Sequence, residues 1–184
     1  MKQLYILRHA KSSWAQPGLG DIERPLNKRG ERQVDRLQEW LNSNKIQINQ
    51  ILCSPSTRTQ ATYRGLQPAL GDTPVEIVKS LYHGRMENYL EALWSQAADR
   101  IMMIGHNPTC DELTRYLTSP TSPAAEKLMA HHFGTATLAI LSFEIDDWSQ
   151  IGQASGTLTQ LLRPREIEGG GEGGSDGGGN SHSH

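Results

Sequence analysis

Short apolar runs alternate with longer segments of helical periodicity, and this alternation constrains the fold more than any other feature of the sequence. The apolar runs occupy residues 4–7, 51–53, 75–78, 101–104, 136–143 and 158–162. Strands that alternate with helices predict an α/β fold, here a layered α/β/α domain with a mostly parallel central sheet. No full helix separates the last two runs, so we expect them to pair antiparallel through the connection at residues 146–156.

Three capping patterns predict where helices begin and end. Asn27 precedes a segment with apolar residues on one face and is expected to cap that helix. Ser54, followed by a proline, is typical of an N-cap, and Gly71 is expected to end the helix it begins. Thr109 and Glu112 have the spacing of a capping box.

Three tryptophans are expected to pack in the core or at its edge: Trp40, Trp94 and Trp148.

The composition predicts one domain at residues 1–167, followed by a disordered glycine-rich tail at residues 168–184. The formal net charge of −2 favours neither a nucleic-acid nor a membrane partner. Four acidic residues follow Arg165, so residues 1–165 carry a net charge of +2, which mildly favours an anionic ligand.

No apolar stretch approaches the ~20 residues that span a bilayer, and a cytoplasmic location is expected. Cys53 and Cys110 are expected to be small buried hydrophobes.

Basic and imidazole side chains follow three of the predicted strands. Arg8 and His9 come after the first strand, Arg58 after the second and His106 after the fourth. Singly, an Arg or His past a strand is more often a surface or capping residue. Because the carboxyl ends of parallel strands meet at one edge of a sheet, we expect these four side chains to converge there.

The chemistry of these four residues fits phosphoryl transfer, which is mostly positioning and charge stabilisation. Arginine has planar donors that grip two phosphate oxygens, which gives Arg8 and Arg58 a binding role. A neutral imidazole attacks phosphorus without a metal, so His9 is the candidate nucleophile. His106 is expected to donate to a phosphoryl oxygen as charge moves in the transition state.

The order of these motifs resembles the SixA-type phosphohistidine phosphatases of the histidine phosphatase superfamily, which also contains the phosphoglycerate mutases. The similarity covers about residues 2–167 and rests on residues 7–14, 21–30, 54–62, 105–108 and 162–165. It implies a phosphoglycerate mutase-like fold with a small lid insertion. It also implies that His9 is phosphorylated, that Arg8, Arg58 and His106 bind phosphate, and that neither a metal nor an organic cofactor is needed.

Further site residues are less sharply indicated. Arg24 is a candidate for the rim of the phosphate pocket or a solvated tether, and Ser12 is a candidate hydrogen-bond donor or a turn residue. Many superfamily members carry a general acid in an inserted segment, here near residues 81–87. His83 and Glu87 are the nearby titratable groups, although a loop histidine and an acid in a first helical turn are common without catalytic roles.

A missing acid would itself indicate the substrate. A phosphohistidine can be protonated on its second ring nitrogen and leave as neutral imidazole, whereas an alkoxide needs a proton from the enzyme. The leading hypothesis is therefore hydrolysis of phosphohistidine in a protein, or of a related labile phosphate, through phospho-His9. The alternatives are a small-molecule phosphomonoester phosphatase, a non-catalytic phosphate- or partner-binding module on the same fold, and, least favoured, a mutase. The sequence leaves the oligomeric state open.

Overall fold

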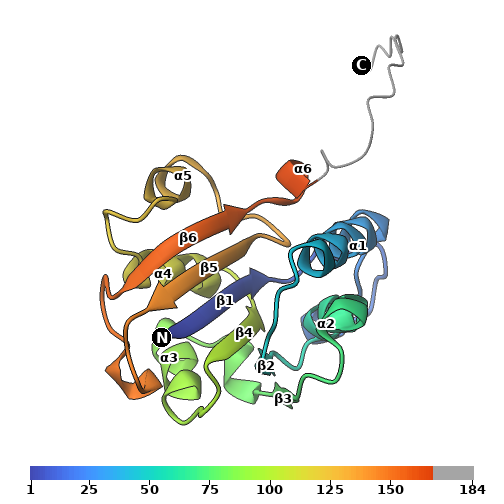
Figure 1. The fold of residues 1–184 in the computed structure, drawn as a ribbon. Helices are drawn as coiled ribbons and strands as arrows, with labels where there is room; N and C mark the ends of the chain where they lie inside the picture. The colour runs from blue at the N-terminus through green and yellow to red at the C-terminus, as the bar shows by residue number, and fades with distance from the viewer. Residues whose placement is uncertain (168–184) are drawn as a thin grey trace, which may run out of the picture.

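Six strands form one sheet in the order β3-β2-β4-β1-β5-β6 (Figure 1). This computed structural model describes residues 1–167, so the predicted tail at 168–184 lies outside the described residues. The strands are β1 (Lys2–Arg8), β2 (Gln50–Cys53), β3 (Val75–Ile77), β4 (Arg100–Gly105), β5 (Leu138–Phe143) and β6 (Gly156–Leu162). β1 pairs parallel with β4, and β2 pairs parallel with β4 and β3. β5 pairs antiparallel with β6, as the missing helix between them predicts, and it also pairs antiparallel with β1.

Helices cover both faces of this sheet (Figure 1). The α-helices are α1 (Lys28–Ser43), α2 (Thr57–Leu70), α3 (Met86–Trp94), α4 (Thr109–Leu117), α5 (Ala125–Ala130) and α6 (Pro164–Ile167). Three 3₁₀ turns lie in the connections that follow β1, β3 and β5: η1 (Asp21–Glu23), η2 (Lys79–Leu81) and η3 (Trp148–Gln150). The layered α/β/α prediction is confirmed, and the segment between β3 and α3 is as short as the small lid insertion requires.

The alternation of side chains along β1 divides the core into two layers. Leu4 and Ile6 pack on the face covered by α3 and α4, whereas Tyr5 and Leu7 pack on the face covered by α1 and α2. All four are nearly inaccessible to solvent, as expected for a strand covered on both faces. Side chains therefore cover both faces of β1, and its carboxyl end remains open for a site.

Of the three predicted helix starts, the first is correct and the other two are displaced by one or two residues. Asn27 caps α1 as predicted, accepting from the Gly30 amide at 2.8 Å. The N-cap of α2 is Ser56 rather than Ser54, because the proline after Ser54 still lies in the turn before the helix. Thr109 forms no capping box with Glu112, since its hydroxyl donates to the Gly84 carbonyl and Pro108 is the N-cap.

The remaining packing predictions are mostly confirmed. Gly71 ends α2 with a positive φ of 63°, and Cys53 and Cys110 are buried free thiols. Trp148 is fully buried and Trp40 packs against the core, but Trp94 at the end of α3 is 48% exposed. That prediction was wrong because helical spacing does not reveal where a helix leaves the sheet. No helix within residues 1–167 is long and apolar enough to cross a membrane.

Candidate active site

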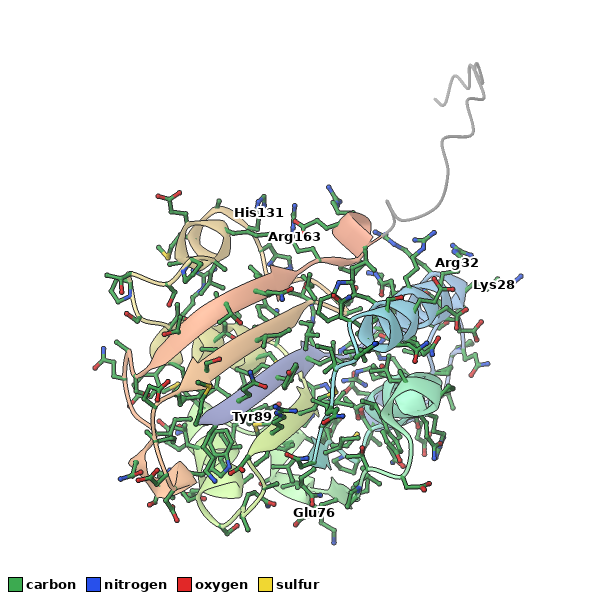
Figure 2. All side chains as sticks on the ribbon, viewed as in Figure 1. Lys28, Arg32, Glu76, Tyr89, His131 and Arg163 are labelled. Carbon is green, nitrogen blue, oxygen red and sulfur yellow. The ribbon has the colours of Figure 1, made fainter. Side chains whose placement is uncertain are left out.

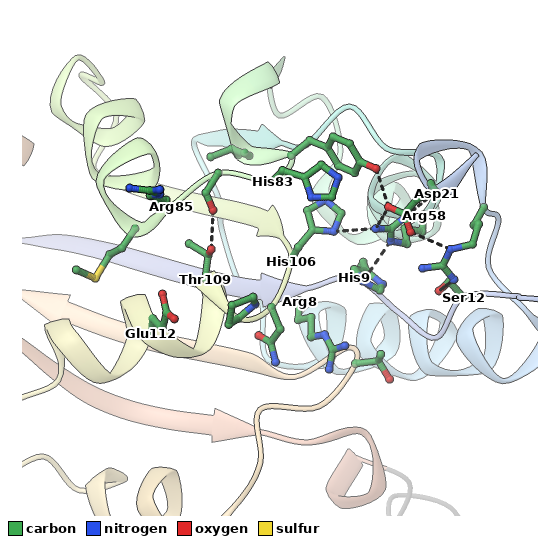
Figure 3. A pocket seen from close by; sticks show the side chains of 18 of the residues that line it. Arg8, His9, Ser12, Asp21, Arg58, His83, Arg85, His106, Thr109 and Glu112 are labelled. Atoms are coloured by element: carbon green, nitrogen blue, oxygen red, sulfur yellow. Dashed lines mark hydrogen bonds and ion pairs between the residues drawn. The ribbon is translucent and has the colours of Figure 1, made fainter. Parts of the chain in front are cut away.

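The four basic and imidazole side chains predicted to converge line one cavity at the carboxyl ends of β1, β2 and β4 (Figure 3). We call this cavity, of about 780 Å³, the first cavity. Its floor is formed by Arg8, His9, Arg58 and His106, and its wall by the segment at residues 81–87. The rings of His9 and His106 lie with their centroids 5.3 Å apart.

Backbone and helix contacts fix the loop that carries His9. The His9 amide donates to the Gly105 carbonyl at 3.1 Å, which continues the β1–β4 pairing one residue further. The next amide, of Ala10, donates to the Thr62 hydroxyl of α2 at 3.1 Å. A side chain at Gly30 of α1 would place its Cβ 2.0 Å from the Lys11 carbonyl oxygen, so only glycine permits this close approach. Both helices of this face thus hold the loop.

The hydrogen bonds of His9 determine its tautomer. Its Nδ1 lies 2.7 Å from the Ala10 carbonyl oxygen, which accepts only, so Nδ1 carries the hydrogen. Its Nε2 therefore keeps the lone pair and accepts from Arg58 Nε at 3.4 Å. Burial, followed by the neighbouring arginines, lowers the pKa of His9 to about 4. At neutral pH His9 is a neutral imidazole with its lone pair on the cavity side.

Arg58 lies in the first turn of α2 and is 5% exposed. Its Nη1 donates to the backbone carbonyl of Asp21 at 2.7 Å, and its Nη2 donates to the carboxylate of Asp21 at 3.0 Å. The same Nη2 lies 3.4 Å from Nδ1 of His106. The guanidinium is thus oriented on three sides and faces both imidazoles.

Buried groups hold His106 across the cavity from His9. Its amide donates to the hydroxyl of Tyr89, a fully buried residue of α3, at 3.1 Å. A Cβ at Gly105 would lie 2.3 Å from that hydroxyl, so the glycine is required for this contact. His106 Nε2 lies 2.8 Å from the Ser54 hydroxyl, and Nδ1 faces Arg58, which only donates. The hydrogen is therefore on Nε2.

Burial, His9 and Arg58 together lower the pKa of His106 to about 3, so the ring is neutral at neutral pH. Donation from its Nδ1 to a phosphoryl oxygen requires protonation of that nitrogen. A phosphate dianion in the cavity would favour the protonated ring through its opposite charge. The predicted donor role of His106 therefore depends on the ligand itself.

Arg8 lies at the boundary of the floor. Its Nη1 donates to the Phe133 carbonyl at 3.2 Å, while its buried Nε has no hydrogen-bond partner among residues 1–167. Burial lowers the pKa of this guanidinium from its usual value. An anion beside Arg8 would supply the missing acceptor.

Asp21 and Tyr82 form a contact that the sequence analysis did not anticipate. The Asp21 carboxylate accepts from the Tyr82 hydroxyl at 2.6 Å and from both Arg24 and Arg58 (Figure 3). Tyr82 and the two arginines hold the pKa of Asp21 well below its usual range, so Asp21 stays ionised. Asp21 lay within a recognised motif, but nothing in its spacing indicated a partner 37 positions away.

The two subsidiary candidates, Ser12 and Arg24, lie together at the rim. Arg24 is buried rather than a solvated tether, and its Nη1 donates to the Ser12 hydroxyl at 2.7 Å. The exposed ring of Trp14 covers its guanidinium at 3.5 Å, a cation–π contact. Arg24 also donates to Asp21, so it contributes to the same charge network as Arg58.

The wall carries the two acid candidates, His83 and Glu87. Both line the first cavity and both are exposed. The His83 ring packs against Tyr82 with centroids 4.0 Å apart. Glu87 lies in the first turn of α3 and has no hydrogen-bond or ion-pair partner within residues 1–167. A general-acid role for either residue remains a prediction. Within the same residues, no group of three or more His, Cys, Asp and Glu side chains is arranged to hold a metal ion.

Comparison with known proteins gives a consistent result. The model of the histidine phosphatase superfamily (branch 1) matches residues 4–83. The phosphohistidine phosphatase SixA of Escherichia coli is 26% identical over 171 residues, covering 90% of this chain and 96% of that protein.

Two solved structures show the same fold. One, from Agrobacterium tumefaciens and provisionally assigned as phosphohistidine phosphatase SixA, is 26% identical with a TM-score of 0.75, covering 89% of this chain and 98% of that one. A mycobacterial glucosyl-3-phosphoglycerate phosphatase is 16% identical with a TM-score of 0.60, covering 86% of this chain and 99% of that one. At that identity the second likeness concerns the fold alone.

Proposed function

We propose that this chain is a member of the histidine phosphatase superfamily and that it hydrolyses phosphohistidine on a phosphorylated protein through a phospho-His9 intermediate. The family match and the SixA-like neighbours support phosphatase activity. The more specific proposal, a phosphohistidine substrate, is supported by the construction of the floor and by the wall above it.

The observation that carries the proposal is the state of His9. Its Nδ1 hydrogen is committed to the Ala10 carbonyl at 2.7 Å, and its Nε2 lone pair faces the guanidinium of Arg58. A phosphoryl group bound by Arg8 and Arg58 would therefore meet a neutral nitrogen nucleophile already in the reactive tautomer. Attack needs no prior loss of a proton.

In the first step, the His9 Nε2 lone pair forms a bond to phosphorus while the bond from phosphorus to the substrate nitrogen breaks. The leaving imidazole is protonated on its other ring nitrogen and departs neutral. The Ala10 carbonyl accepts from Nδ1 and stabilises the positive charge that the phosphorylated ring acquires. In the second step, water attacks phosphorus, the P–Nε2 bond breaks, phosphate is released and the water gives up a proton to it.

The wall supports a substrate whose leaving group needs no strong acid. His83 and Glu87 are exposed, and neither hydrogen-bonds to a floor residue that would orient it. The short segment between β3 and α3 leaves room above the floor for a protein side chain. An alkyl phosphate, whose alkoxide needs protonation, would lose the ~10²–10⁴-fold that general acid catalysis contributes.

Side-by-side turnover of a phosphohistidine peptide and of alkyl phosphates tests this proposal. We expect kcat/KM for the peptide to exceed that for the esters by at least about 10²-fold. Equal rates would favour a small-molecule phosphomonoester as the substrate. The name of one fold relative, glucosyl-3-phosphoglycerate phosphatase, indicates a substrate of this class. Tight phosphate binding with no turnover of either substrate would instead indicate a non-catalytic binding module.

A further inference from the structure

A second cavity of about 990 Å³ adjoins the first and shares Arg8, Lys11 and Thr135 with it. Its lining contains seven arginine or lysine side chains and no aspartate or glutamate. Three of the arginines come from α1, at positions 29, 32 and 36, and two from the end of β6 and α6, at positions 163 and 165. Figure 2 shows Arg32 on α1 and Arg163 beyond β6 at the same end of the molecule.

Three of these arginines have no partner within the described part of the chain. Arg163 pairs with Glu166 at 3.0 Å. By contrast, Arg29, Arg32 and Arg165 form no hydrogen bond or ion pair through their side chains with any residue of 1–167. The contrast with the first cavity is sharp, because there the Asp21 carboxylate pairs with Arg58.

Buried polar atoms without partners also line the second cavity. The hydroxyl of Thr137, a residue that is 1% exposed, has no hydrogen-bond partner among residues 1–167, and neither has Nε of Arg8. A buried polar group without a partner is destabilising, so native structures normally satisfy it with a ligand, a water or an ion. Two such atoms in a lining that also contains the unpaired Arg29, Arg32 and Arg165 indicate a site that receives an anionic group.

The spacing of the arginines favours an extended ligand over a single small anion. Positions 29, 32 and 36 follow i, i+3, i+7 and so form a stripe along one face of α1. At 1.5 Å per residue this stripe extends about 10 Å. Its length fits several carboxylates spaced along a polypeptide, and the lining offers no Phe, Tyr or Trp ring on which a nucleotide base would stack.

We infer that the second cavity docks an acidic segment of the protein whose phosphohistidine enters the first cavity. The inference rests on the proposed function, because the shared residues Arg8, Lys11 and Thr135 make the two cavities continuous. The phosphoryl group would bind on the floor while glutamate or aspartate side chains of the same protein pair with Arg29 and Arg32. Selectivity among phosphohistidine proteins would then depend on acidic residues beside the modified histidine.

Two phosphohistidine peptides of equal length test this inference, one flanked by three glutamates and the other by three glutamines. With the full-length enzyme at low salt, we expect kcat/KM for the glutamate peptide to be about tenfold higher, mainly through KM. The double variant Arg29→Glu/Arg32→Glu should reduce that ratio to about one. The matched control Arg64→Glu changes the same charge on an exposed position of α2 outside both cavities and should preserve the ratio.

Equal rates for the two peptides with the unmodified enzyme would overturn the inference, as would a ratio that collapses equally in Arg64→Glu. Fluorescence anisotropy with the unphosphorylated glutamate peptide separates docking from chemistry. If neither phosphopeptide is hydrolysed but the glutamate peptide still binds through Arg29 and Arg32, the proposed function fails and the docking surface stands. Tighter binding of inorganic tripolyphosphate than of the glutamate peptide would identify a small-anion site and overturn the assignment of a protein segment.

Discussion

Buried hydrogen bonds hold the floor of the first cavity, whereas the two acid candidates in its wall are exposed to solvent. His9 and Arg58 are 6% and 5% exposed, and each is fixed by a hydrogen bond to a backbone carbonyl, of Ala10 for His9 and of Asp21 for Arg58. His83 and Glu87 in the wall are exposed and face the floor without bonding to it. Phosphate binding and nucleophilic attack therefore depend on residues held in place at the edge of the sheet. The residues above the phosphate are not held in this way, so they can differ with the substrate.

The largest expected effect comes from removing the nucleophile. His9→Ala should lose on the order of 10⁴-fold or more of kcat, because the variant lacks the nitrogen that attacks phosphorus, and His106 is expected to donate to a phosphoryl oxygen instead of attacking. The measurement is steady-state turnover of a phosphohistidine peptide, with circular dichroism to show that the variant is folded. Turnover within tenfold of the unmodified enzyme would remove His9 from the chemistry.

Arg58→Ala should reduce kcat/KM by about 10²–10³-fold, as the loss of a preorganised charge donor does in other enzymes. Because Arg58 also orients both imidazoles, kcat and KM should both change. Arg64→Ala is the matched control, since it removes an exposed arginine from the same helix. Similar losses in the two variants would show that charge near α2 matters but that the position of Arg58 does not.

The burial of His9 predicts a dependence of stability on pH. Its folded pKa of about 4 lies below the ~6.5 of an unfolded histidine, so the unfolded chain binds more protons between these values. Stability from this residue is present above pH ~6.5 and is lost as the pH falls toward 4. At pH 5 the penalty is about 2 kcal/mol, roughly thirtyfold in the folding equilibrium constant.

Urea unfolding of the unmodified protein and His9→Ala at pH 7 and pH 5 measures this penalty. The variant should lose less stability than the unmodified protein on acidification. An identical loss in both proteins would mean that His9 titrates as it does in the unfolded chain, and the neutral-nucleophile argument would lose its basis.

Asp21 tests the contact between floor and wall. Its carboxylate pairs with Arg58 and Arg24. Its negative charge therefore repels an incoming phosphate, while the same ion pair orients the guanidinium of Arg58 that would bind that phosphate. Asp21→Asn should bind inorganic phosphate several-fold more tightly, because a negative charge 3.0 Å from Arg58 is lost, and should lower kcat modestly. Competitive inhibition by phosphate measures the first effect, and weaker inhibition in the variant would show that Asp21 does not compete with the anion.

The smallest effects are expected in the wall. His83→Ala and Glu87→Gln should each change phosphohistidine turnover by less than about threefold, because the leaving imidazole needs no strong acid. Rates on the phosphohistidine peptide, measured beside an alkyl phosphate, provide the check. A 10²-fold or larger drop in rate for either variant would identify a general acid in the wall. It would also show that turnover depends on the wall as well as on the floor.

The sequence predicted the floor because each of its residues ends or follows a parallel strand. Parallel strands bring their carboxyl ends to one edge, so Arg8, Arg58 and His106 converge as a consequence of topology alone. The period of β1, with Leu4 and Ile6 on one face and its other apolar residues on the opposite face, likewise determined the two layers of the core.

The charge network was not predictable in the same way. Asp21 reaches Arg58 from a 3₁₀ turn in the loop between β1 and α1, and Tyr82 reaches Asp21 from the wall. These contacts depend on loop conformations that no hydrophobic period encodes. For the same reason the sequence did not assign Ser54 to its hydrogen bond with His106. The sequence did not predict the second cavity either, because its arginines come from three separate segments of the chain.

The most direct test of the account is to trap the phosphoenzyme. Enzyme mixed with a peptide carrying radiolabelled phosphohistidine is quenched within one turnover under alkaline conditions, digested and sequenced. We expect one acid-labile label, located on His9 and missing from His9→Ala. Label on a different residue, or full turnover with no labelled enzyme at any time, would contradict the proposed attack by His9.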